Sequence, residues 1–338
     1  MIAKGFTRCS ERCEKIRSEL VQAVPAIEVD RAYYLTQSYK ETENEPHIIR
    51  RAKALEKILL NLPVVIREGE LVVGSLTKNP RSCQLYPEFS YEWVMAEFDT
   101  IATRLADQFT ITEEDKKTFR EILPYWKDKT VSDLALAYMS KETKDAMSQG
   151  VFTVGNYLFG GVGHVIKSHF WKATLIVLNA GIQWAKRYAD KDREMAAACT
   201  DAKRKAELLQ IAANCEKVPA QGATTFHEAC QSFIFTQFIL QCESSGHSVS
   251  PGRFDQYMYP YLEKDTISRE DAQELLDCVF LKLNDLNKVR DDISSQGLEY
   301  GWHDSAFFNA AKILELTIHN GKNKGVQVGP QSGDVTRR

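Results

Sequence analysis

The sequence lacks the features that mark secreted, membrane-spanning or nucleic-acid-binding proteins. Its first residues, MIAKGFTRCSERCEKIR, have no apolar core of the kind found in signal peptides. No run is long and apolar enough for a membrane span. The net charge of −3 and the pI of about 6.2 give no general attraction toward nucleic acid or anionic lipid. These absences predict a cytoplasmic protein that binds neither nucleic acid nor membrane.

Cysteine motifs for metal binding are also missing. Cys9 and Cys13 are separated by three residues rather than two, and no second pair lies nearby, so a zinc ribbon is not predicted. Cys230, Cys242 and Cys278 occur in apolar, helix-like surroundings, where an inert buried thiol is the usual state. In a cytosolic chain these thiols are expected to be free rather than disulfide-bonded.

The chain contains enough apolar residues, 43% of 338, for a sizeable core. No internal repeat, low-complexity linker or clear boundary divides it, so residues 1–338 are expected to form a single unit. Two short β-branched runs, at 64–66 and 71–74, predict two strands or a hairpin. A helix beginning at Thr224 or Thr225 is apolar around most of its circumference, which predicts burial. The composition and pattern favour a helix-rich α/β fold.

A polar stretch follows that apolar helix, from Cys242 to Leu262. It brings His247 and Ser248 close to Arg253 and Asp255, and the Pro251-Gly252 and Pro260 positions predict that it is not one continuous helix. Polar residues in irregular backbone after a buried element are typical of an active-site loop.

Two further polar positions, His164 and the pair His303-Asp304, also follow hydrophobic segments. Together with His247 and Ser248 they could meet at one end of an α/β core. Imidazoles, a hydroxyl and a carboxylate suit a small polyol, because they donate to and accept from its hydroxyl groups. A metal site built from His164, His247 and Asp304 would use the same residue types, but no short ligand spacing such as HxxxH supports it. No metal is therefore assigned.

Long, rare sequence strings relate the chain to a known family. They are REGELVVGSLTKNPRS at 67–82, GVFTVGNYLFGGVGHV at 150–165, TDAKRKAEL at 200–208, ESSGHSVSPGRFDQYMYPY at 243–261, KLNDLNKVRD at 282–291 and GWHDSAFFN at 301–309. Through these strings the chain resembles the glycyl-radical enzymes of the pyruvate formate-lyase superfamily. Within that superfamily it is most similar to the B12-independent glycerol and propane-1,2-diol dehydratases.

The resemblance implies a fold, a reaction and a partner. The fold would be a ten-stranded barrel of two half-sheets surrounded by helices. In such enzymes an activating enzyme, which uses S-adenosylmethionine and an iron–sulfur cluster, generates a radical on a glycine. That radical produces a thiyl radical on a cysteine, and the diol then loses water to give an aldehyde. A small diol substrate and the activating enzyme are the implied partners, no bound cofactor is implied, and a homodimer is left open.

The resemblance also assigns substrate-binding residues. His164 resembles the diol-contacting histidine of the family, and His247 with Ser248 matches its His-Ser pair. Asp304 matches the aspartate that holds the substrate hydroxyl groups. These are the same residues that the polar clusters single out on chemical grounds.

The sequence departs from the family at three places. The stretch DDISSQGLEY before GWHD contains no cysteine where the family places a GCVE motif, so a block near 292–300 is expected to be missing. A second gap is expected after His164-Val165, and the chain reaches Arg338 without a glycyl-radical motif. We therefore expect a truncated, internally deleted lyase domain without the C-terminal glycyl-radical domain, in which no catalytic residue is assigned. The alternatives are a non-catalytic remnant or partner of a full-length relative and, ranked lower, a metal-dependent hydrolase.

Overall fold

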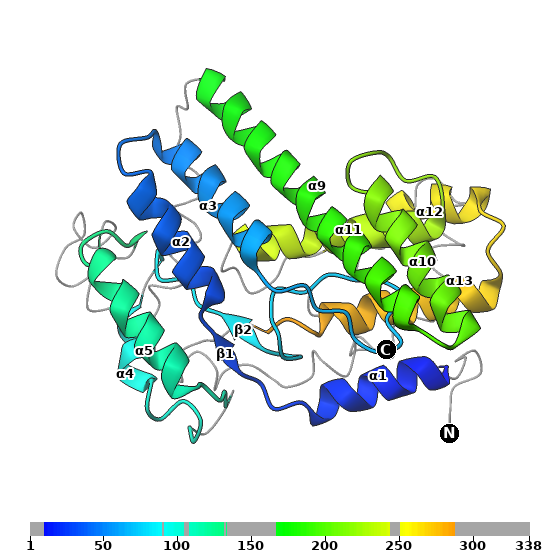
Figure 1. Cartoon of the computed structure of the whole chain (residues 1–338), viewed down its shortest axis with the longest axis horizontal. Coiled ribbons are helices and arrows are strands. Elements are labelled where there is room, and N and C mark those ends of the chain that lie inside the picture. Colours follow the sequence, from blue (N-terminus) through cyan, green and yellow to red (C-terminus); the bar gives the residue numbers. More distant parts are fainter. Residues whose placement is uncertain are drawn as a thin grey trace.

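A computed structural model of the chain describes residues 10–89, 91–104, 108–131, 133, 167–243 and 251–287. In this part of the chain the architecture is mainly helical (Figure 1). The helices are α1 (Glu11–Gln22), α2 (Asp30–Glu41), α3 (His47–Asn61), α4 (Glu92–Glu97), α5 (Glu113–Ile122), α9 (Lys167–Ala198), α10 (Ala202–Lys217), α11 (Phe226–Glu243), α12 (Phe254–Lys264) and α13 (Arg269–Leu283), with a 3₁₀ turn η1 at Leu123–Tyr125.

Polar side chains fix the starts of several helices. The hydroxyl of Thr112 accepts from the backbone N–H of Asp115 at 3.0 Å at the start of α5, and Ser268 does the same for Asp271 at the start of α13. Each of these bonds satisfies one of the backbone donors that a helix leaves unpaired in its first turn. Thr225, immediately before α11, accepts from the N–H of Glu228 at 3.2 Å. The predicted start of α11 at Thr224 or Thr225 is confirmed.

Helix α11 lies at the centre of the main core, as its apolar composition predicts. Trp184 and Tyr188 of α9 pack on Phe235 of α11, with ring centroids 5.3 and 5.8 Å apart. Figure 1 shows α9 and α10 as a helical hairpin, with α3 alongside α9 and α2 alongside α3. Helix α13 joins the same core from the other side and lies next to α1.

The only sheet within the described ranges is a parallel pair of two-residue strands, β1 (Ile27–Glu28) and β2 (Cys83–Gln84). Ile27 pairs with Cys83 and Glu28 with Gln84. A second, smaller core forms around these strands and contains Phe98, which follows α4, and Phe119 of α5. The described residues therefore combine a helical body with a short strand pair beside it.

The strands expected at 64–66 and 71–74 are absent, and this prediction was wrong. Both runs have irregular backbone, although Val72 and Val73 are fully buried. Side chains replace the neighbouring strand: Gln231 accepts from the N–H of Val73 at 2.9 Å and donates to its carbonyl at 2.7 Å. Tyr188 accepts from the N–H of Ser75 at 2.8 Å. Buried backbone groups need partners, and here helices α9 and α11 provide them.

The stretch from Cys242 to Leu262 is not one continuous helix, as predicted, but Pro260 does not mark a break, since it lies inside α12. A proline removes one helical hydrogen bond and strains the preceding turn. The helix nevertheless forms because Phe254 and Met258 anchor it in the main core. The predicted break at Pro251-Gly252 holds, since α12 begins only at Phe254 and Gly252 adopts a positive φ of 66°.

Candidate functional site

The predicted substrate-binding residues His164, His247, Ser248 and Asp304 all lie outside the described residues. Their positions and mutual distances therefore remain predictions. The structure does describe both sides of the segment that carries His247 and Ser248. That segment, 244–250, leaves the end of α11 and is followed by Pro251.

The last carbonyl groups of α11 are bound by side chains from elsewhere in the chain. The hydroxyl of Tyr86 donates to the carbonyl of Gln241 at 2.7 Å, and Arg31 Nε donates to that of Cys242 at 2.8 Å. Arg51 Nη2 donates to the carbonyl of Glu243. A helix leaves its final carbonyls without internal partners, and its C-terminal end carries partial negative charge. The guanidinium groups of Arg31 and Arg51 and the hydroxyl of Tyr86 therefore supply hydrogen bonds, and the two arginines also positive charge, at the C-terminal end of α11.

The two arginines are held by two glutamates, and we name Arg31, Arg51, Glu88 and Glu243 the ionic clamp. Glu88 Oε1 accepts from Arg31 at 2.5 Å and from Arg51 at 2.9 Å, while Glu88 Oε2 accepts from Arg31 at 3.1 Å. Glu243 Oε1 accepts from Arg51 Nε at 2.6 Å. Two positive and two negative groups make the clamp formally neutral. Its centre is dry: the side chains of Arg31 and Glu88 are only 1% and 4% exposed.

Burial alone would raise the pKa of the Glu88 carboxyl, but Arg31 and Arg51 outweigh it and hold that pKa below its usual value. Arg31 also stacks on Tyr86, with its guanidinium carbon 3.7 Å from the ring centroid. The clamp thus joins α2, α3 and the segment after β2 to the end of α11. It fixes the point from which residues 244–250 continue.

The other polar residues of the predicted loop occupy the start of α12. Arg253 is exposed and precedes the helix, where its carbonyl accepts from the N–H of Gln256 at 3.0 Å. Asp255 is buried in the first turn of the helix. The predicted active-site loop is therefore bounded by two helices: α11 ends at Glu243 and α12 begins at Phe254.

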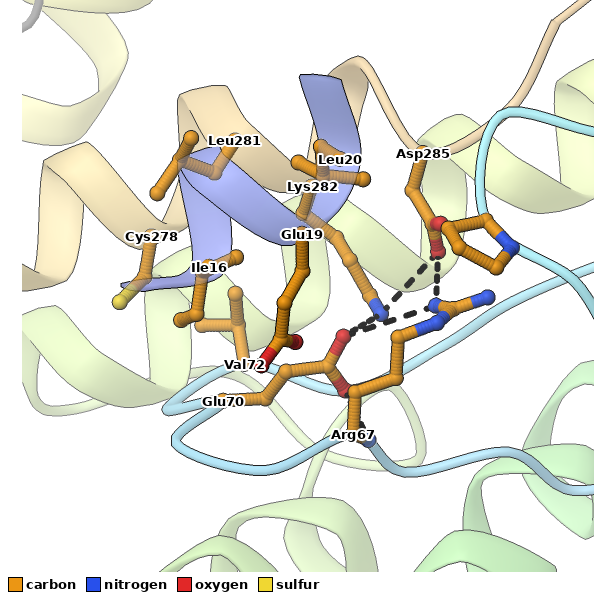
Figure 2. A pocket seen from close by; sticks show the side chains of 11 residues that line it. Ile16, Glu19, Leu20, Arg67, Glu70, Val72, Cys278, Leu281, Lys282 and Asp285 are labelled. Carbon is orange, nitrogen blue, oxygen red and sulfur yellow. Dashed lines mark hydrogen bonds and ion pairs between the residues drawn. The ribbon is translucent and has the colours of Figure 1, made fainter. Parts of the chain in front are cut away.

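A second charged cluster comes from two of the family-like strings. Arg67 binds Asp285, and Lys282 binds Glu70 and lies 3.4 Å from Asp285. Figure 2 shows these four side chains pointing toward one another beside a cavity of about 40 Å³. Arg67 Nη2 and Asp285 Oδ1 are buried and have no partner among the described residues.

That cavity has room for water but its charged groups already pair with each other, so it suits a solvating water rather than a substrate. We assign the second cluster to the scaffold that joins the 67–82 segment to the end of α13. Sequence reasoning missed both charged clusters. The only signal was that Arg67, Glu70 and Lys282 lie in rare strings shared with the family.

Metal ligands do not assemble in the part of the chain that the structure covers, where no group of three or more His, Cys, Asp or Glu side chains could hold an ion. The alternative metal set of His164, His247 and Asp304 lies outside that part. The described cysteines are free thiols, and Cys230, Cys242 and Cys278 are buried as predicted. Among the described helices, none is long and apolar enough to cross a membrane.

Comparison with solved structures defines the class of the fold. The chain superposes on a structure of 1,2-propanediol dehydration in Roseburia inulinivorans with a TM-score of 0.80 at 48% identity, covering 86% of this chain and 41% of that one. It also matches the glycerol-bound B12-independent glycerol dehydratase of Clostridium butyricum, with a TM-score of 0.81 at 44% identity, covering 87% of this chain and 42% of that one. The helix-rich, incomplete pyruvate formate-lyase-type fold predicted from the sequence is confirmed.

The chain belongs to the pyruvate formate lyase-like family, which it matches over residues 7–168, 166–297 and 292–338. The probable dehydratase YbiW of Escherichia coli K12 is 33% identical over 321 residues, covering 83% of this chain and 40% of the relative. The chain thus spans about 40% of the length of the relatives it matches. The family contains glycyl-radical lyases, so the predicted enzyme class of the relatives is confirmed.

Proposed function

We propose that the chain forms the diol-binding part of a glycyl-radical dehydratase, and that His164, His247, Ser248 and Asp304 bind a small vicinal diol. The observation that carries this proposal is the ionic clamp, because it holds the end of α11 from which residues 244–250 continue. A polyol removed from water needs a partner for each hydroxyl group. Two imidazoles, a hydroxyl and a carboxylate supply such donors and acceptors.

The similarity to the two solved structures supports a diol as the substrate class. The first concerns 1,2-propanediol dehydration and the second is a glycerol-bound dehydratase, and both exceed 40% identity to this chain. Glycerol and propane-1,2-diol share the vicinal hydroxyl pair that the proposed residues would bind.

We further propose that these 338 residues do not dehydrate a diol by themselves. The family reaction needs a cysteine shortly before the GWHD string, and the sequence has no cysteine after Cys278. The boundaries between the three family matches fall at 166–168 and 292–297, which are the two places where family segments are expected to be missing. In this proposal residues 1–338 form one incomplete domain located in the cytoplasm, and the activating enzyme and a homodimer belong to the full-length form.

Diol binding is tested by calorimetric titration of the purified chain with glycerol and with propane-1,2-diol. His247→Ala is expected to weaken binding by roughly 10-fold, because removing one buried hydrogen-bond partner costs about 1–3 kcal/mol. His169→Ala is the matched control, since His169 lies on α9 outside the proposed set and is expected to leave the affinity unchanged. Equal affinities for the wild type and both variants would contradict the proposed site.

The absence of catalysis is tested in the same preparation. The chain is incubated anaerobically with a diol-dehydratase activating enzyme and S-adenosylmethionine, and then supplied with each diol. We expect no glycyl-radical doublet in the EPR spectrum and no aldehyde. A doublet accompanied by aldehyde would overturn this part of the proposal while leaving the binding result intact.

An exposed apolar stripe on α9 favours a second candidate function, that of a partner of a full-length relative. Trp171, Leu175 and Leu178 are 55%, 61% and 58% exposed. Their spacing places them on one face of the helix. The opposite face packs through Ala173 on Ile49 of α3. A contiguous exposed apolar face is typical of a surface that another polypeptide covers.

This candidate predicts association that depends on the stripe. Mixed with a full-length B12-independent glycerol dehydratase, the chain is expected to sediment as a complex. Leu175→Glu with Leu178→Glu is expected to weaken that complex at least about 10-fold, because two buried leucines each contribute about 1.5–3 kcal/mol. Leu209→Glu, on the exposed face of α10, is the control. A monodisperse monomer that unfolds cooperatively with and without the relative would count against the candidate.

A further inference from the structure

Two buried cysteines from opposite ends of the described chain lie side by side. Cys13 Sγ of α1 and Cys278 Sγ of α13 are 3.8 Å apart, and the two residues are separated by 265 positions in sequence. Cys13 is 0% exposed and Cys278 is 4% exposed. Figure 1 shows α1 running beneath α13, and the two helices are in contact. A disulfide needs its sulfurs about 2.05 Å apart, so side-chain rotation and a small helix shift would close the remaining distance.

We propose that Cys13 and Cys278 form an oxidative modification site, at which a small peroxide joins α1 to α13 through a disulfide. Cys278 lines the cavity of about 40 Å³ between α1, α13 and the 67–72 segment, and Figure 2 shows it at one edge of the group of lining side chains. A cavity of water size admits a reagent as small as hydrogen peroxide, while it excludes bulky disulfides. The cavity therefore gives Cys278, and through it the buried pair, access to a specific class of oxidant.

The reaction balances with peroxide as the only oxidant. The sulfur of one thiol attacks a peroxide oxygen, an S–O bond forms, the O–O bond breaks, and the departing hydroxide takes the thiol proton to become water. The second sulfur then attacks the sulfenic sulfur, an S–S bond forms, the S–O bond breaks, and a second water leaves with the remaining proton. Two thiols are oxidised and one peroxide is reduced to two waters.

The neighbouring groups make this reaction slow at neutral pH. The hydrogen bond with Cys13 and burial raise the pKa of Cys278 above its usual value, and the nearby Glu274 adds to this while Arg12 opposes it. Since the thiolate is the nucleophile, the rate is expected to rise with pH. Asp277, on the same helix, interacts electrostatically with Cys13. The titratable groups that line the cavity beside Cys278 are Glu19, Arg67, Glu70, Lys282 and Asp285.

The test is intact mass and peptide mapping of the full chain after hydrogen peroxide treatment at pH 8.5. The wild type is expected to lose the mass of two hydrogen atoms and to yield a linked Cys13–Cys278 peptide, with the thermal midpoint raised by roughly 5 °C. Cys13→Ser and Cys278→Ser are expected to abolish this link, whereas the matched buried control Cys230→Ser keeps it. Peptide mapping of the wild type needs no variant to fold.

Two outcomes would overturn the proposal. One is a wild type in which the partly exposed Cys199 is oxidised under the same conditions while Cys13 and Cys278 remain thiols. The other is a disulfide that links different cysteines. Reversal of the mass change and of the thermal shift by dithiothreitol would separate the disulfide from irreversible oxidation.

Discussion

Replacing Glu88 by alanine is expected to lower the free energy of unfolding by about 3–5 kcal/mol, because it removes the shared carboxylate of a buried ion pair. Arg31 and Arg51 would then keep their guanidinium groups inside the protein without that partner. Urea denaturation followed by circular dichroism measures the change. Glu41→Ala, which removes a surface pair with Lys57, is the control and is expected to change stability by less than about 1 kcal/mol.

The pH dependence of the same variant provides a second readout. Arg31 and Arg51 hold the pKa of Glu88 below its usual value. A depressed carboxyl pKa stabilises the folded state at every pH above the unfolded pKa, and this stabilisation is lost as the pH falls through the folded value. The difference between wild type and Glu88→Ala is therefore expected to be constant near neutral pH and to shrink in acid. A difference that grows in acid would contradict the role assigned to the ionic clamp.

Diol binding by Glu88→Ala distinguishes a role of the ionic clamp in the binding site from a role in stability alone. If it positions the segment after α11, Glu88→Ala should weaken diol binding under conditions where the chain is still folded. The Glu41→Ala control should leave both properties unchanged. Loss of stability with unchanged diol affinity would mean that the clamp serves the fold alone.

Features that depend on residues close together in the sequence, such as helix starts and the burial of a helix, could be predicted from the sequence. The start of α11 at Thr224 or Thr225 was predicted correctly, because a helix cap such as the bond from the Glu228 N–H to the Thr225 hydroxyl involves only neighbouring residues. The apolar circumference of α11 predicted its central position for the same kind of reason. Helix starts and burial needed no knowledge of distant residues.

Long-range partners could not be read from the sequence. Val72 and Val73 have the composition of a strand, yet the backbone of Val73 is paired by Gln231, which lies 158 residues away. Arg31 and Arg51 stand in helices whose charged residues would ordinarily face solvent, and their partner Glu88 lies in a separate segment. The proposed site residues His164, His247, Ser248 and Asp304 rest on the family resemblance and on chemistry, and they remain predictions.

Asp192 supplies the second large expected effect, because it is a fully buried carboxyl without a hydrogen-bond partner among the described residues. Burial raises the pKa of Asp192 to about 7, and the nearby Arg204 offsets this only in part, while Glu70 reinforces it. An elevated carboxyl pKa means that the folded state resists ionisation. An unfolded aspartate ionises near pH 3.8, so the contribution of Asp192 to the stability of the wild type should fall as the pH rises from about 4 to 7.

Asp192→Asn removes this penalty, since an amide does not ionise. The difference in unfolding free energy between the variant and the wild type is measured at pH 4 and at pH 8. At pH 8 this difference is expected to favour the variant by a few kcal/mol more than at pH 4, because each pKa unit corresponds to about 1.4 kcal/mol. Urea denaturation at both pH values measures the gain, and comparing the two pH values cancels any packing change caused by the amide. Asp190→Asn, the same replacement at an exposed neighbour on α9, is the control. Equal effects of Asp192→Asn at pH 4 and pH 8 would show that the carboxylate is solvated in the folded protein, and the buried-acid interpretation would then fail.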